Sequence, residues 1–205
     1  MALIYEDKVP ASYRSAFIDK VKKISTNLGI DPNWLMAIMY FESMGTFSPS
    51  ITNSIGATGL IQFIPSTASS LGTSTSALKK MTAVQQLDYV EKYLKTYKGK
   101  YNNYIDVYFA VFFPLAIGKP DDWVIQGNGL SASSIYNSNP AFRVVKDGKL
   151  RVWEVKKVML EKLPSEWLNN GSFSLALKSY KNQIIIGMLS VILGVTLYYK
   201  YGRNK

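Results

Sequence analysis

The sequence of 205 residues contains no cysteine and no histidine. The lack of cysteine excludes disulfides and thiol nucleophiles, and the lack of histidine excludes serine–histidine triads and the usual zinc sites. Carboxylate chemistry is what remains. We predict neither a cofactor nor a bound metal.

Acidic residues are also scarce, with 14 Asp and Glu against 24 Lys and Arg, which gives a formal net charge of +10. The basic residues are dispersed among acids and no recognition motif accompanies them, so we expect no nucleic-acid partner. A mild positive field suits an anionic cell-wall polymer. The hydrophobic content of 47% is enough for one core.

The hydrophobic periodicity is mainly helical, which predicts the α class. Ser12 and Gly29 are expected to cap a first helix, and Pro164 to stop a last one. The predicted helices run from about residue 12 to 28, 31 to 43, 82 to 97, 105 to 113 and 155 to 163, with Val84, Leu87, Val90 and Leu94 facing inward in the third.

One carboxylate lies where a helix should carry a hydrophobe. Asp31 and Pro32 are typical of a helix start. The apolar stripe of this helix then leads to Glu42, seven residues after Leu35. Glu42 is therefore expected to point inward, although a solvated Glu at a frayed helix end is the alternative.

Two effects should raise the pKa of Glu42. They are desolvation against Trp34, Ile38 and Met39, and the negative end of the helix dipole. A carboxyl group that is still protonated near neutral pH can serve as the general acid in glycosidic cleavage.

The following segment is rich in glycine, and Gly56 and Gly59 permit close backbone approaches that suit a cleft wall. It contains Glu42-Ser43, a proline within ten residues, Gly-Ala-x-Gly-Leu-x-Gln over 56–62 and Pro-x-Thr-Ala over 65–68. This ordered set resembles the core signature of the soluble lytic transglycosylase family.

The resemblance implies a lysozyme-like helical domain of the goose-type or soluble-transglycosylase kind, with a small irregular or β segment at the cleft. It implies that Glu42 is catalytic and that Gly59 belongs to a loop that forms one wall of the glycan groove. Gln62 would face the sugar, and Ser43 would steady the acetamido group or Glu42. The alternative for Gln62 is a satisfied amide in a glycine-rich turn.

The resemblance also implies a reaction on peptidoglycan. Glu42 protonates the oxygen between N-acetylmuramic acid and N-acetylglucosamine, then takes a proton from the muramic C6 hydroxyl, which closes a 1,6-anhydro ring. No Asp or Glu lies between Ser43 and Leu87, which favours a mechanism with one carboxylate. A hydrolytic muramidase is the nearest alternative, because folding could bring in a second acid from Asp88, Glu91, Asp106, Asp121 or Asp122.

The sequence departs from the family at a later Ala-Tyr-Asn-x-Gly motif. The corresponding stretch runs from Tyr108 to Pro114 and lacks that pattern. Tyr108 is the candidate for the missing active-site tyrosine. Further tyrosines recur at 89, 93, 97, 101 and 104, and they favour packing over a sugar-binding wall.

Residues 143–154 resemble an EF-hand loop in their second half only. Arg143 and Val145 occupy the positions of the first two ligands and cannot coordinate calcium. We predict a degenerate loop, or a hairpin turned by Asp147-Gly148, without metal.

The end of the chain changes in character. Residues 182 to 199 are uncharged and would span about 27 Å as a helix, close to a bilayer core. The predicted organisation is a catalytic domain over 1–170, a basic linker over 171–181, a transmembrane helix over 182–200 and a basic tail over 201–205. This predicts a lipid membrane as a partner.

The N-terminus has neither a basic region nor a long apolar run, so we predict no signal peptide. The hypothesis that reconciles this with a cell-wall substrate is carriage in a virion, with other virion proteins as partners. A virion protein whose lysozyme-like domain has lost activity is a third alternative.

Overall fold

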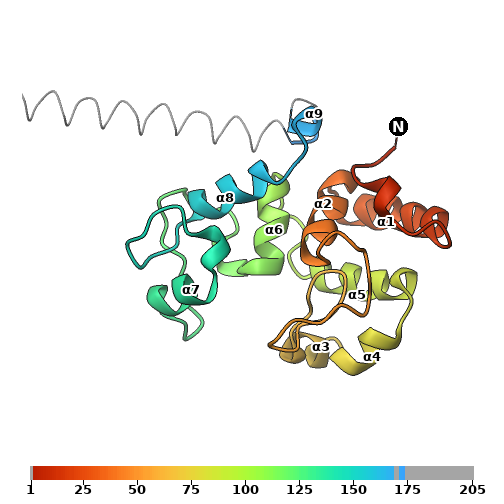
Figure 1. The fold of residues 1–205 in the computed structure, drawn as a ribbon, viewed down its shortest axis with the longest axis horizontal. Coiled ribbons are helices and arrows are strands. Elements are labelled where there is room, and N and C mark those ends of the chain that lie inside the picture. Colours follow the sequence, from red (N-terminus) through yellow and green to blue (C-terminus); the bar gives the residue numbers. More distant parts are fainter. Residues whose placement is uncertain (1, 169–170, 174–205) are drawn as a thin grey trace, which may run out of the picture.

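The computed structural model describes residues 2–168 and 171–173, which form a helical body (Figure 1). In the described part of the chain, β structure is limited to isolated bridges. The elements are η1 Glu6–Lys8, α1 Arg14–Leu28, α2 Pro32–Glu42, α3 Pro65–Ser70, α4 Thr75–Lys80, α5 Ala83–Lys95, α6 Tyr104–Phe112, η2 Pro114–Ala116, α7 Ala132–Ser138, η3 Pro140–Phe142, α8 Val152–Glu161 and α9 Ser165–Leu168.

The helix α2 follows closely from its sequence. The Asp31 carboxylate accepts a hydrogen bond from the backbone N–H of Asn33 at 2.8 Å, and Pro32 lies in the first turn. Gly29, with φ 73°, ends α1 as predicted. The prediction that Ser12 caps α1 was wrong, because the helix begins at Arg14 after Tyr13, whose side chain makes no capping bond.

In α5, Thr82 and Gln85 form a capping box, and Leu87, Val90 and Leu94 are fully buried. Val84 is only half-buried, whereas Gln86 is fully buried. The core-facing side of α5 therefore includes the Gln86 amide, and the predicted Val84 lies at its edge.

The core lies where α2 contacts α1 and α6, and where α5 contacts the same two helices. Figure 1 shows α1, α3, α4 and α5 on one side of α2 and α6, with α7 and α8 on the other. The segment between α2 and α3 carries the bridges Thr52 to Thr58 and Thr58 to Phe63. These isolated bridges correspond to the small irregular or β segment that the resemblance predicts.

The helix predicted over 155–163 is α8, which begins at Val152 and ends before Pro164. Asp147-Gly148 turns the chain, with Gly148 at φ 78°, but no hairpin of strands flanks this turn. The only described bridge nearby joins Val124 to Arg151.

No helix in 2–168 or 171–173 is long and apolar enough to cross a bilayer. The helix predicted over 182–200 and the tail over 201–205 lie outside the described residues. Phe173, three residues beyond the predicted domain end at residue 170, is 1% exposed and belongs to the core.

Candidate active site

Glu42 is the last residue of α2, so the predicted helix end is present. Its side chain is largely enclosed by protein although the residue keeps some exposure, and burial raises its pKa to about 7. Ile38 and Met39 are fully buried on the same helix. The predicted contribution of Trp34 was wrong, because its indole N–H donates to the carbonyl of Ser172 near the opposite end of α2.

Tyr108 reaches Glu42 from α6. A hydrogen bond from the Tyr108 hydroxyl stabilises the ionised carboxylate and lowers the pKa of Glu42, partly opposing the effect of burial. Desolvation by burial raises the pKa of Tyr108 well above its usual value, and the charge of Glu42, the neighbouring Tyr104 and the same hydrogen bond add to this effect. The fold thus brings together the predicted acid and the tyrosine proposed for it; the role of that tyrosine in the reaction stays a prediction.

Aromatic rings hold Tyr108 in place. Its ring meets Phe41 edge-on, with centroids 5.9 Å apart, and stacks on Phe112 at 5.9 Å. Phe142 contacts the same cluster, with its centroid 6.1 Å from that of Tyr108. This packing limits the rotation of Tyr108 and directs its hydroxyl at Glu42.

Ser43 follows Glu42 and is fully buried. Its hydroxyl oxygen accepts a hydrogen bond from the backbone N–H of Phe47 at 2.8 Å, and its carbonyl accepts one from the Thr46 hydroxyl at 2.6 Å. Ser43 therefore fixes the turn after α2. Of its two predicted roles, only support of Glu42 is compatible with this enclosed position.

Gly59 is buried in the loop and has φ +87°. A Cβ atom there would lie 2.1 Å from the side-chain oxygen of Gln86, so only glycine fits. The Gln86 oxygen accepts from the N–H of Leu60 at 2.6 Å, and its amide donates to the carbonyls of Pro49 and Leu78. Gly59 therefore allows the loop to pack closely on the Gln86 side chain, and its buried position faces protein.

Sequence reasoning missed Gln86. Only its burial could have been predicted, because Gln86 interrupts an apolar helical stripe in the same way as Glu42 does. Here the polar group is satisfied by three backbone groups, and its function is to anchor the loop.

Gln62 borders a groove of about 590 Å³ between the loop, α5 and the end of α6. Its φ is +51°, and its amide donates to the carbonyls of Ile51 and Gly59 at 3.3 and 3.2 Å. We call this space the Gln62 groove; its other lining residues include Phe63, Lys92, Tyr93, Tyr97 and Phe112. Because Phe112 stacks on Tyr108, the groove adjoins the cluster that holds the partner of Glu42.

Residues 19–113 match the family model of the transglycosylase SLT domain. The chain carries an SLT domain. The matched region contains Glu42, Gln62 and Tyr108, and it ends one residue after α6. Members of this family are lytic transglycosylases, lyases that act on peptidoglycan. No solved structure matches the chain.

The tyrosines of the SLT domain mainly pack. The Tyr93 hydroxyl donates to the carbonyl of Ala110 at 2.6 Å, and the Tyr101 hydroxyl donates to that of Leu94 at 2.7 Å. Tyr93 and Tyr97 contact each other edge-on and also line the Gln62 groove. The stripe joins α5 to α6 and contributes two partly exposed rings to the groove wall.

The five acids considered as a second carboxylate contact other groups of the protein or are exposed. Asp122 is exposed. Among the described residues, the causes of the raised pKa of Glu42 include no neighbouring acid. The other four acids have partners in the protein. Asp88 pairs with Lys20, and Glu91 accepts a hydrogen bond from Asn27. Asp106 accepts from the backbone N–H groups of Asn102 and Gly118, and Asp121 pairs with Lys156.

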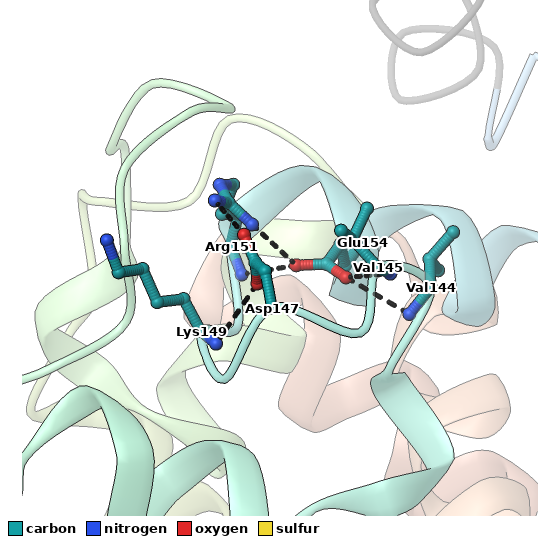
Figure 2. Close-up of polar contacts among 6 residues, drawn as sticks. All are labelled: Val144, Val145, Asp147, Lys149, Arg151 and Glu154. Carbon is teal, nitrogen blue, oxygen red and sulfur yellow. Dashed lines mark hydrogen bonds and ion pairs between the residues drawn. The ribbon is translucent and has the colours of Figure 1, made fainter.

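The EF-hand-like loop lies beyond the matched SLT region, and Figure 2 shows that its last carboxylate faces protein donors. Glu154 is fully buried. One oxygen accepts from the N–H groups of Val144 and Val145 at 3.0 and 2.8 Å, and the other accepts from that of Arg151 at 2.9 Å. The Arg151 guanidinium also pairs with Asp147 at 2.6 Å. These donors engage both oxygens of the residue at the calcium-ligating twelfth position, and no group of three or more metal-binding side chains occurs in the described residues.

Proposed function

We propose that this protein cleaves the β-1,4 bond between N-acetylmuramic acid and N-acetylglucosamine and forms a 1,6-anhydro-muramic end, with Glu42 as acid and then base. The observation that carries the proposal is the pairing of Glu42 and Tyr108 in a family of peptidoglycan lyases. Burial raises the pKa of Glu42 to about 7, and the pairing gives the carboxylate a donor.

The two halves of this reaction need opposite protonation states of one group. A carboxyl group with a pKa of about 7 is substantially protonated at neutral pH and can give its proton to the bridging oxygen as that bond breaks. The resulting carboxylate takes the proton of the C6 hydroxyl, whose oxygen then bonds to the anomeric carbon. The Tyr108 hydroxyl stabilises the ionised carboxylate between these steps, and the proton count balances without water.

The surroundings of Glu42 support a mechanism with one carboxylate. Enzymes that use two carboxylates keep the second one within about 10 Å of the first. The acids that sequence order left open are engaged by other protein groups or exposed. The substrate acetamido group would therefore stabilise the positive anomeric centre, as the family resemblance implies.

We propose that part of the glycan strand, on one side of the cleaved bond, binds in the Gln62 groove. The groove presents partly exposed aromatic rings, which stack on sugars, and Lys92, a cation suited to an anionic polymer. The Lys92 ammonium also donates to the carbonyl of Leu71 at 2.9 Å, which holds it at the groove wall.

The deciding experiment is digestion of purified peptidoglycan with the wild type and with Glu42→Gln, followed by mass spectrometry. Anhydro-muramic ends that appear only with the wild type support the proposal. Reducing muramic ends would instead identify a muramidase. If both proteins bind glycan and neither cleaves it, the domain is a wall-binding protein without activity.

We further propose that residues 182–200 anchor the protein in a membrane and that a virion carries it. The support is the uncharged, apolar sequence between Lys181 and Lys200. Fractionation of the expressing cells tests the anchor: a full-length protein extracted from membranes by salt alone would refute it. Absence of the protein from purified virions would refute the carriage.

A further inference from the structure

Residues 171–173 lie against the start of the catalytic helix. The carbonyl of Ser172 accepts a hydrogen bond from the indole N–H of Trp34, and its hydroxyl accepts one from the Asn33 amide at 3.3 Å. The Asn33 side-chain oxygen in turn accepts from the N–H of Ile4 at 3.0 Å. The first turn of α2 is thus held by both the beginning of the chain and the segment after α9.

Phe173 enters the core beside α6. It is 1% exposed, and its ring meets Tyr104 edge-on with centroids 5.1 Å apart. Tyr104 is also 1% exposed and is the first residue of α6, one helical turn before Tyr108. Phe173 therefore packs against Tyr104, which lies one turn of α6 before Tyr108, the partner of Glu42.

Tyr104 belongs to the surroundings of the carboxylate. Burial is the main cause of the raised pKa of Tyr104, and the charges of Tyr5 and Glu42 add to it. Burial and the charge of Glu42 raise the pKa of Tyr108, and Tyr104 adds a smaller effect. Tyr104 also lines a cavity of about 400 Å³ together with Phe41 and Met44, which lie close to Glu42 in the sequence. A shift of Tyr104 would therefore change both the position and the hydration of the acid.

We propose that residues 171–173 form a clamp on the catalytic helix and that Phe173 is a positioning residue for Glu42, acting through Tyr104 and Tyr108. The segment that leads to the apolar C-terminal sequence is then part of the support of the active site and not a passive linker. This inference rests on the proposed function for its effect on rate, but the contacts themselves do not depend on that function.

Several other titratable or charged groups surround Tyr104 and Tyr108, and a pH titration of Glu42 must be interpreted with them in mind. Tyr104 and Tyr108 of α6 interact with Glu42 directly. Tyr5 adjoins Tyr104 and Tyr40, and Glu166 of α9 acts on Tyr5. On the α8 side, the Lys162 ammonium lies 5.1 Å from the ring centroid of Phe41.

The experiment compares the full-length wild type with Phe173→Ala, Phe173→Leu and Ile135→Ala. Ile135 is a buried residue of α7 outside the clamp, so Ile135→Ala controls for a general loss of core packing. The Glu42 carboxyl carbon is titrated by NMR, with its signal assigned by its loss in Glu42→Gln. Rates of peptidoglycan release are measured over the same pH range, and thermal melting monitors the fold.

We expect Phe173→Ala to admit water behind Tyr104 and to lower the titration midpoint of Glu42 by roughly one pH unit. The rate at neutral pH should fall about tenfold or more, because a small displacement of an acid is costly. Phe173→Leu should restore most of both, and Ile135→Ala should change neither midpoint nor pH profile.

Equal midpoints in the wild type and Phe173→Ala would overturn the clamp, even if the rate falls. If Phe173→Ala does not fold, Phe173→Leu must show a smaller shift in the same direction, or the clamp is refuted. A wild type without activity would refute the proposed function alone, because the NMR titration still tests the clamp.

Discussion

The Tyr108 hydroxyl donates to the Glu42 carboxylate from a different helix, and this contact opposes the effect of burial on the acid. Burial favours the protonated form that begins the reaction. The hydrogen bond favours the ionised form that continues it. The pKa of about 7 reflects a balance in which burial has the larger effect.

Replacing Tyr108 with Phe should shift this balance. The ring remains to fill its aromatic site, but the carboxylate loses its donor, so the pKa of Glu42 should rise by about one unit. The alkaline limb of the pH profile of kcat/KM should move upward by that amount. The maximal rate should fall about tenfold, because the ionised intermediate state is less stabilised.

Tyr101→Phe is the matched control for Tyr108→Phe. Its hydroxyl also donates a hydrogen bond within the protein, to the carbonyl of Leu94, but it does not reach Glu42. This variant should lose some stability and keep the wild-type pH profile. An unchanged profile in Tyr108→Phe would show that the hydroxyl does not tune the acid.

Glu42 should also make stability depend on pH. Its folded pKa of about 7 lies above the ordinary value of 4.5, so the folded state binds the proton more tightly. Stability from this group is present below pH 4.5 and is lost as the pH rises through 7. The cost at alkaline pH is at most about 3 kcal/mol.

Glu42→Gln removes that cost. Melting temperatures of the two proteins should agree near pH 4.5, and the variant should melt at the higher temperature at pH 8. A difference of the same size at both values of pH would mean that the carboxyl is not perturbed by burial. Activity should fall by about a thousandfold or more in the variant, since its amide cannot donate a proton as an acid.

Much of the site could be predicted from local sequence, because its signals are local. Asp31, Pro32 and the stripe that leads to Glu42 specify a helix and an inward carboxylate within a dozen residues. Which residues surround the Glu42 carboxylate could not be predicted from local sequence. Trp34 precedes Glu42 on the chain but lies near the other end of α2, and the hydrogen-bonding partner of Glu42 comes from α6.

Roles that depend on contacts distant in sequence were also beyond prediction. Gln86 supports the loop that contains Gly59 because α5 packs beneath it, and no sequence period predicts that contact. Phe173 follows a predicted domain end, yet the core includes it because its ring fits against Tyr104. Tertiary packing decides such positions, whereas caps and periodicity decide helices.

Gly59 gives a sharp test of the loop. Gly59→Ala would place a Cβ 2.1 Å from the Gln86 side chain and would also strain a backbone at φ +87°, so the two costs add. Gly72 has a similar φ of +76°, and a Cβ added there would meet nothing within 4 Å, which isolates the backbone cost. Urea unfolding should show a loss of about 1 kcal/mol for Gly72→Ala and at least about twice that for Gly59→Ala.

The catalytic consequence of Gly59→Ala should follow from its position. If the Gln62 groove depends on this loop, the variant should lose activity even at temperatures where it stays folded, whereas Gly72→Ala should keep it. Equal stability losses in the two variants would mean that Gln86 yields easily and does not fix the loop.

Replacing Glu154 tests whether internal hydrogen bonds, and not calcium, stabilise the EF-hand-like loop. Three backbone N–H groups and Arg151 surround its carboxylate, so Glu154→Gln should destabilise the protein by about 2 to 4 kcal/mol. Asp147→Asn, at an exposed position of the same loop, should leave the melting temperature nearly unchanged. Because protein donors already engage both oxygens of Glu154, and because Arg143 and Val145 occupy ligand positions, millimolar calcium or a chelator should not shift the melting temperature of the wild type. A stabilisation by calcium that disappears in Glu154→Gln would show that the loop exchanges its internal donors for the ion.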